Sequence, residues 1–232
     1  MATHSIEPSA LEVPLTQAHV DAANALQRRL AGWKLYEGIL RDLAGHFPSN
    51  CDLRHVLPKA ITLNSLYATG ILAIHQMAEH IVQVATKESD RLSPEFADRI
   101  ALLTDLGSGR KTRRCLSFAS KYCHFFVSPE RFAILDAYAV NALVLHMGKT
   151  RLRIDHYASY LSAVDGLIAT AGLRCSYADL DHYLWLAGQR ISYQRSRRLG
   201  KTPSINREVL PLFAEPDAEC AALIERAFGA LP

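Results

Sequence analysis

The sequence predicts an all-α protein, and three observations lead to this prediction. Apolar residues recur at spacings of three and four along most of the 232 residues, which is the period of an amphipathic helix. No stretch long enough to form a strand alternates apolar and polar side chains, which is the pattern of a half-buried strand. Hydrophobic residues make up 49% of the chain and charged residues 21%, a composition typical of a globular protein and not of a disordered tail.

The first helices are predicted from apolar spacing and from the residues before them. Residues 16–45 keep their apolar side chains on one face, which predicts one long helix. Residues 48–58 carry a proline at each end and are expected to form turns. Residues 66–86 predict a second long helix, with Asn64 and Ser65 as candidate N-caps.

Shorter helices are predicted for the rest of the chain. Ser93 followed by Pro94 is a cap followed by a first-turn residue, so a helix is expected over 94–103. No repeat, low-complexity tract or flexible linker separates the elements, so we expect one helical domain over residues 1–232. The remaining predicted helices cover residues 110–126, 136–147, 150–171, 177–190 and 217–229.

The basic residues are unevenly distributed. A net charge of +3, from 26 basic and 23 acidic residues, neither requires nor excludes nucleic acid. Residues 110–114 read RKTRR directly after a Gly-Ser-Gly turn, and residues 190–201 contain five basic residues and no acid. One such run is usually a solvated helix end, but two in one small chain favour contact with phosphate.

Other classes of protein and site find no support in the sequence. The five cysteines form no CxxC pair and the ten histidines are dispersed, so neither a metal nor another cofactor is expected. Unpaired cysteines indicate reduced thiols and a cytoplasmic protein. No apolar run reaches the roughly 18–20 residues of a membrane span, and the first residues lack the pattern of a signal peptide.

The segment 94–147 contains the candidate phosphate-binding turn and the candidate catalytic carboxylate. A short helix is followed by the turn Gly107-Ser108-Gly109, a second helix, the extended apolar piece 132–135 and then Asp136 at the start of the next helix. Backbone N–H groups of a glycine turn can bind a DNA phosphate. By spacing alone, a helix cap explains Asp136 better than a catalytic role does. Basic side chains beside the turn would add to phosphate binding, namely Arg110, Lys111 and Arg113.

This order of elements resembles the helix-hairpin-helix superfamily of DNA glycosylases. GSGRKT is similar to the hairpin of the endonuclease III branch, and FAILD is similar to the segment before the catalytic Asp of adenine and 8-oxoguanine glycosylases. A closer resemblance, over roughly residues 60–190, is to bacterial 8-oxoguanine-glycosylase-like proteins, some of them linked to phage defence. The blocks that carry it are LNSLYAT (63–69), SFASKYC (117–123), PERFAILDAY (129–138) and LDHYLW (180–185).

The resemblance implies roles for particular residues. Asp136 matches the catalytic carboxylate that stabilises the cationic sugar as the glycosidic bond breaks. Asn64 matches the asparagine turn that enters the duplex and contacts the opposite base, and Tyr67 could fill the gap left by an extruded base. A helix cap and a core aromatic are the structural alternatives for Asn64 and Tyr67.

The catalytic lysine of bifunctional members has no direct match. Those members carry a lysine about 18 residues before the Asp, and its amine forms a Schiff base with the sugar. In this chain that position is Phe118, beside Ser117, and Lys121 lies one helical turn after Ser117. Lys111 fits the hairpin better but lies 25 residues before the Asp. The nucleophile is therefore Lys121, Lys111 or a water, and we favour Lys121 as a site residue.

The resemblance implies a monomeric DNA glycosylase, with or without AP-lyase activity, that acts on double-stranded DNA. A flipped base would stack in a pocket between two helical lobes, and the expected lining residues of this pocket are Ser117, Tyr122 and Tyr138. The base stays open between 8-oxoguanine and a hypermodified phage base such as glucosylated hydroxymethylcytosine. The alternatives are a non-catalytic helix-hairpin-helix DNA-binding module and a structural helical protein.

Overall fold

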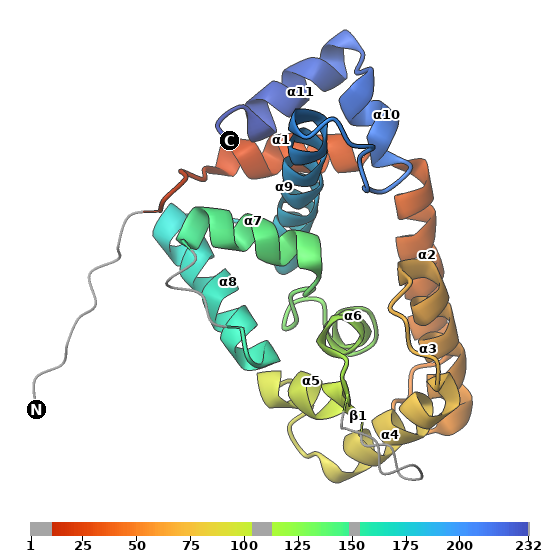
Figure 1. Cartoon of the computed structure of the whole chain (residues 1–232). Helices are drawn as coiled ribbons and strands as arrows, with labels where there is room; N and C mark the ends of the chain where they lie inside the picture. The colour runs from red at the N-terminus through yellow and green to blue at the C-terminus, as the bar shows by residue number, and fades with distance from the viewer. Residues whose placement is uncertain (1–10, 104–112, 149–153, 232) are drawn as a thin grey trace, which may run out of the picture. The chain divides into compact units, whose positions relative to one another are not determined.

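The protein is all-α, as the apolar spacing predicts. The computed structural model describes residues 11–103, 113–148 and 154–231, which form eleven helices and one short two-stranded ribbon (Figure 1). The chain divides into two compact units, named for their place in the sequence. The central unit comprises Leu30–Asp136 and Ile154–Leu161, and the terminal unit comprises Met1–Arg29, Ala137–Arg153 and Ser162–Pro232. The expectation of one domain stays a prediction.

The central unit is built around one buried helix. Its elements are α2 (Ala31–His46), α3 (Leu53–Tyr67), α4 (Ile74–Lys87), α5 (Pro94–Ala101), β1 (Leu102–Leu103), β2 (Arg113–Arg114) and α6 (Leu116–Phe126). Helix α6 packs against α2, α3 and α5, and Figure 1 shows it almost end on, with α2 and α3 to one side. Most of α6 is buried, including the polar residues Ser120, Lys121 and His124. A lysine in such a helix costs free energy unless its amine has partners.

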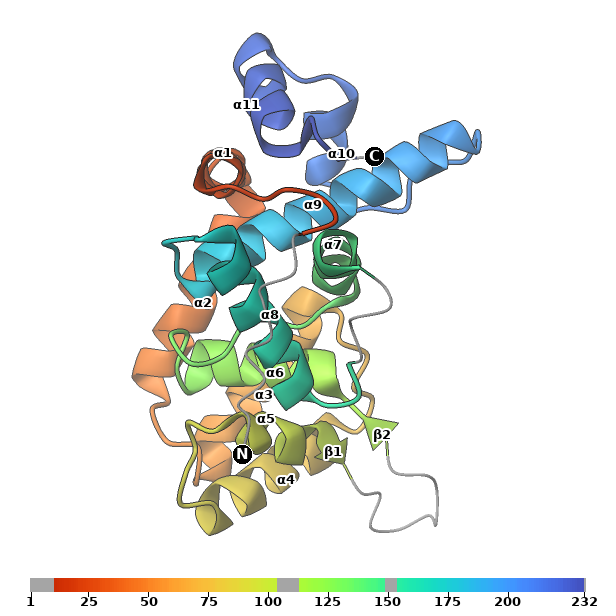
Figure 2. The same ribbon diagram turned by 90° about the vertical axis from the view of Figure 1, so that its left-hand side faces the viewer.

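The terminal unit is arranged around its longest helix. The 22-residue helix α9 (Tyr177–Arg198) packs against α7 (Ala137–Met147) and α1 (Gln17–Gln27), and α1 also packs against α11 (Ala218–Phe228) (Figure 2). The short helix α10 (Val209–Ala214) completes the set. Helix α8 (Tyr157–Ala171) contributes its first residues to the central unit and the rest to the terminal unit.

A glycine permits the close crossing of α7 and α9. A Cβ atom added at Gly188 would lie 2.2 Å from the carbonyl oxygen of Tyr138, so the helices would have to separate to accept any larger residue. We expect Gly188→Ala to lower the free energy of unfolding by about 1–3 kcal/mol, the usual cost of overpacking. Thermal unfolding measures this change. The control is Gly38→Ala in α2, where no atom lies within 4 Å of the added Cβ. Since alanine favours helix, that variant should be as stable as the wild type or more so.

Capping residues predict some helix boundaries well. Helix α5 begins at Pro94 with Ser93 as its N-cap, which confirms that prediction. Helix α3 begins after Asp52, whose side chain accepts a hydrogen bond from the backbone N–H of Arg54. The turn-rich interpretation of residues 48–58 is wrong over 53–58, because α3 includes Pro58 in its interior. Burial of the apolar side chains of α3 offsets the backbone hydrogen bond that the proline cannot make.

The two long helices predicted first are each interrupted. The single helix over 16–45 is wrong, because the chain passes from one unit to the other at Arg29–Leu30 and α1 and α2 are separate. The helix over 66–86 is also wrong, since Ala68 and Gly70 adopt positive φ values of 47° and 70° that no helix contains. Asn64 and Ser65 therefore lie inside α3 and are not N-caps of a following helix.

Boundaries in the second half differ from the prediction at several places. Helix α5 ends at Ala101 and α6 begins only at Leu116, because Leu102 pairs with Arg114 and Leu103 with Arg113 in the antiparallel ribbon. Helix α8 begins at Tyr157, α9 continues to Arg198, and α10 is not among the predicted helices. Across the described ranges, no helix combines the length and the apolar character needed to cross a membrane.

Candidate functional site

An extended segment with an unusual hydrogen-bonding pattern leads to the candidate site. Residues 132–135 are buried and belong to neither strand of the ribbon. Three of their carbonyl oxygens accept hydrogen bonds from side chains. One of these side chains lies on the preceding helix α6, and the other two lie on α8. His124 Nδ1 lies 2.7 Å from the oxygen of Phe132, Tyr157 donates to Ala133 at 2.8 Å, and Tyr160 donates to Ile134 at 2.7 Å. A carbonyl only accepts, so the proton of this pair is on His124 Nδ1.

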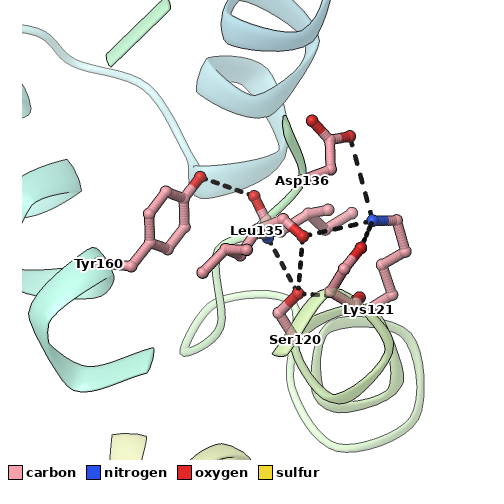
Figure 3. Close-up of polar contacts among 7 residues, drawn as sticks. Ser120, Lys121, Leu135, Asp136 and Tyr160 are labelled. Carbon is pink, nitrogen blue, oxygen red and sulfur yellow. Dashed lines mark hydrogen bonds and ion pairs between the residues drawn. The ribbon is translucent and has the colours of Figure 1, made fainter. Parts of the chain in front are cut away.

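The last residue of the segment is held by a serine of α6. The backbone N–H of Leu135 donates to Ser120 Oγ at 2.9 Å, and the Ser120 hydroxyl lies 3.3 Å from the carbonyl oxygen of Leu135 (Figure 3). These contacts satisfy buried backbone groups as a neighbouring strand would. The segment is therefore fixed from both sides, and it delivers Asp136 to the position just before α7.

Lys121 and Asp136 form a pair at the end of this segment. Lys121 Nζ lies 4.0 Å from Asp136 Oδ2, and the two side chains are 4% and 17% exposed (Figure 3). The amine also donates to Ser117 Oγ at 2.9 Å and lies 3.4 Å from the carbonyl oxygen of Leu135. Opposite charges and several acceptors offset the cost of burying the ammonium group. The carboxylate is the more exposed partner of the pair.

The ring of Tyr67 lies beside Lys121. Lys121 Nζ lies 5.7 Å from the centre of the Tyr67 ring, within the range of a cation–π interaction. The ring also contacts Trp33 edge-on, with centroids 5.4 Å apart, and Phe125 at 5.7 Å. This packing favours the core-aromatic interpretation of Tyr67 over its insertion into DNA. The structure thus brings together Asp136, Lys121, Ser117 and Tyr67, all in the central unit.

The side chain of Asn64 holds the loop that follows α3. Its side-chain oxygen accepts from the backbone N–H of Ile71 at 3.0 Å and from the hydroxyl of Thr69 at 2.7 Å. Its amide nitrogen donates to the carbonyl oxygen of Ile71 at 3.0 Å. Because the amide is engaged on both sides with the loop after α3, it is not available to read a base without breaking these bonds.

Tyr122 does not join the site but belongs to a second buried cluster. Its hydroxyl donates to Asn50 Oδ1 at 2.8 Å, and the same oxygen accepts from Lys59 Nζ at 2.6 Å. Burial raises the pKa of Tyr122 and lowers the pKa of Lys59 to about 8. Asn50 also donates to the carbonyl oxygen of Phe126 at the end of α6. The sequence does not predict a buried Lys59, since no local pattern marks this residue as buried.

The other predicted binding residues are only partly described. Tyr138 belongs to the terminal unit, where its hydroxyl donates to the carbonyl oxygen of Ser204 at 3.0 Å. Arg113 lies in β2, and its neighbour Arg114 is exposed and donates to the carbonyl oxygen of Asp155. The basic end of α9 includes the exposed side chains of Arg195, Arg197 and Arg198. Four predicted residues lie outside the described ranges, namely Gly107, Gly109, Arg110 and Lys111.

The contacts of Ser120 give a testable prediction. Ser120→Ala removes the acceptor of the Leu135 N–H in a fully buried position, so we expect the free energy of unfolding to fall by about 1–3 kcal/mol. Denaturant titration checks the value. Ser65→Ala, a matched change at an exposed position of α3, should leave stability within about 0.5 kcal/mol of the wild type. Equal stability of the two variants would contradict the role assigned to Ser120.

Comparisons with known proteins give a family but no activity. A model of the HI_0787_N family, described as an N-terminal domain, matches residues 16–131. An uncharacterized protein of Haemophilus influenzae is 31% identical over 132 residues, which cover 55% of this chain and 63% of that protein. The match therefore spans less than two thirds of that relative's length. No solved structure matches the chain.

Proposed function

The chain belongs to the HI_0787_N family, and we propose that it is a DNA N-glycosylase that flips a damaged or modified base and cleaves its N-glycosidic bond. The observation that carries the proposal is the Lys121–Asp136 pair, an amine and a carboxylate 4.0 Å apart at the end of a rigidly held segment. The resemblance to 8-oxoguanine-glycosylase-like proteins supports it, because Asp136 matches the catalytic carboxylate of that group. The family match covers Lys121 and ends five residues before Asp136.

In the proposed reaction Asp136 stabilises positive charge. The bond between C1′ and the base nitrogen breaks, its electron pair leaves with the base, and the sugar becomes oxocarbenium-like. A carboxylate held beside that sugar lowers the energy of the transition state, and it does so most effectively where water is scarce. Ser120 and Tyr160 act as positioning residues for Asp136, since they fix the backbone of Leu135 and Ile134 just before it.

Lys121 is the favoured nucleophile. Its ammonium group, 4.0 Å from Asp136 Oδ2, first gives one proton to solvent, and the neutral amine adds to C1′ as the base leaves. The departing base takes the proton that Nζ then gives up, so Asp136 keeps its charge. The sugar ring then opens, its ring oxygen takes a proton from solvent, and the C1′–Nζ bond becomes a Schiff base that water hydrolyses. The other two routes stay open, with Lys111 as the nucleophile or with a water that adds to C1′ directly.

The proposed partner is double-stranded DNA, and we propose a helix-hairpin-helix element that would bind it. We assign α5 and α6 to the two helices of a helix-hairpin-helix element, which the packing of α5 against α6 supports. The exposed arginines at the end of α9 and Arg114 before α6 would contact phosphates. The base is a damaged one such as 8-oxoguanine or a modified phage base, and the role is accordingly repair or antiphage defence.

The proposal is tested with a panel of duplexes. Each contains 8-oxoguanine, glucosylated hydroxymethylcytosine or only normal bases, and abasic sites are detected as strand breaks after alkali. We expect abasic sites in at least one modified duplex and none in the normal one. Salt-dependent duplex binding without abasic sites would indicate the non-catalytic DNA-binding module instead.

A further inference from the structure

The loop between α3 and α4 is short and firmly held. Residues 68–73 are fixed by the three hydrogen bonds of Asn64, and the side chain of Ile71 is buried at 5% exposure. Positive φ values at Ala68 and Gly70 turn the chain sharply on either side of Thr69. A loop with a buried anchor and a side-chain amide bound to its backbone keeps one conformation and loses little entropy when it meets a partner.

This rigid loop carries a leucine in solvent. Leu72 follows the buried Ile71 and is 93% exposed, the largest value among the exposed large hydrophobic residues in the described part of the chain. Single exposed leucines are common on protein surfaces. Leu72 differs from such residues because it follows the buried, hydrogen-bonded Ile71, which fixes the backbone beside it, while its own side chain is almost fully exposed.

The loop starts at the candidate site. Helix α3 ends at Tyr67, whose ring lies 5.7 Å from Lys121 Nζ, and Leu72 follows Tyr67 by five residues. Five residues span at most about 18 Å, so Leu72 lies no farther than that from Tyr67. Both residues belong to the central unit.

An enzyme that extrudes a base needs a side chain to occupy the gap in the stack. Proteins that unstack DNA insert apolar side chains between base steps, and the cost falls when the inserted group is already exposed and held in place. The two side chains that the resemblance implies for this task are both engaged elsewhere. Tyr67 is packed against Trp33 and Phe125, and Asn64 is bound to the loop.

We propose that Leu72 is the side chain that enters the base stack and that Asn64 positions it. The partner is duplex DNA at the step from which a nucleotide has been turned out. This inference rests on the proposed function, but it assigns the insertion to a residue that the sequence did not mark. Asn64 then acts through the loop and not on a base.

The test uses a duplex with a tetrahydrofuran abasic-site analogue beside 2-aminopurine, whose fluorescence reports on stacking. Anisotropy measures binding, and the variants are Leu72→Ala and the control Leu35→Ala, which changes another exposed leucine of the central unit. We expect Leu72→Ala to bind about tenfold more weakly and to lose the fluorescence change of the wild type. Leu35→Ala should behave as the wild type does.

The outcomes separate this inference from the proposed function. A wild-type fluorescence change in Leu72→Ala overturns the insertion by Leu72, even if the enzyme releases bases. Loss of that change in Leu72→Ala supports the insertion, even if no base is released from any duplex. Because the side chain of Leu72 is exposed, equal thermal unfolding of the variant and the wild type is expected, and it excludes misfolding as the cause.

Discussion

Asp136→Asn is expected to slow base release by about 100- to 1000-fold, the usual effect of removing one group that stabilises transition-state charge. The amide keeps the shape of the side chain but carries no charge to oppose the cationic sugar. Duplex affinity should change little, because the phosphate contacts proposed for Arg114 and for the end of α9 do not involve this carboxylate. Single-turnover release rates and anisotropy on the same duplex measure the two effects separately.

A matched control distinguishes the site from a general effect of charge. Asp42→Asn makes the same chemical change at an exposed position of α2 in the same unit. It should release bases at the wild-type rate. Because Asp136 pairs with the buried Lys121, the thermal unfolding of Asp136→Asn must be measured alongside. Base release at the wild-type rate by a folded Asp136→Asn variant would overturn the mechanism.

Lys121→Gln is expected to abolish the protein–DNA adduct that borohydride traps from the wild type. Only a Schiff base can be reduced in this way, so the adduct identifies an amine nucleophile. Glutamine can still donate to Ser117 Oγ, which the lysine contacts at 2.9 Å, and it removes only the nucleophile and its charge. Base release should slow by about 100-fold or more, because the nucleophile of the favoured route is lost.

Two companion variants assign the amine. Lys34→Gln changes an exposed lysine of α2 and should leave the adduct intact. Lys111→Gln should also leave it intact if Lys121 is the nucleophile. An adduct that disappears in Lys111→Gln and persists in Lys121→Gln would transfer the role to Lys111. Base release by the wild type without any adduct would assign the attack to water.

Local signals predict the fold class and some helix ends because they act over a few residues. The apolar period and the Ser93–Pro94 pair are of this kind, and both predictions are confirmed. The continuous helix over 16–45 fails because nothing local marks the passage from one unit to the other at Arg29–Leu30. The turn predicted at Pro58 fails for the same reason, because burial of α3 in the tertiary structure outweighs the local signal of the proline.

The candidate site depends on contacts that sequence spacing only partly indicates. The spacing of Ser117 and Lys121 predicts a shared helix face, and their hydrogen bond agrees with it. The tyrosines that hold residues 133 and 134 lie 24 and 26 residues away in sequence, beyond the reach of any local pattern. The resemblance implies DNA contacts for Asn64 and Tyr67, but their observed contacts lie within the protein. The catalytic roles of Asp136 and Lys121 stay predictions.

Mass analysis of the free bases shows whether the protein cleaves the N-glycosidic bond and whether Asp136 is needed for it. Wild type and Asp136→Asn are incubated with DNA carrying 8-oxoguanine, with phage DNA carrying glucosylated hydroxymethylcytosine and with unmodified DNA. We expect the wild type to release one modified base, Asp136→Asn to release almost none, and both proteins to bind the duplex equally. Binding by the wild type without release of any base from these DNAs would overturn the proposal that the protein is a glycosylase.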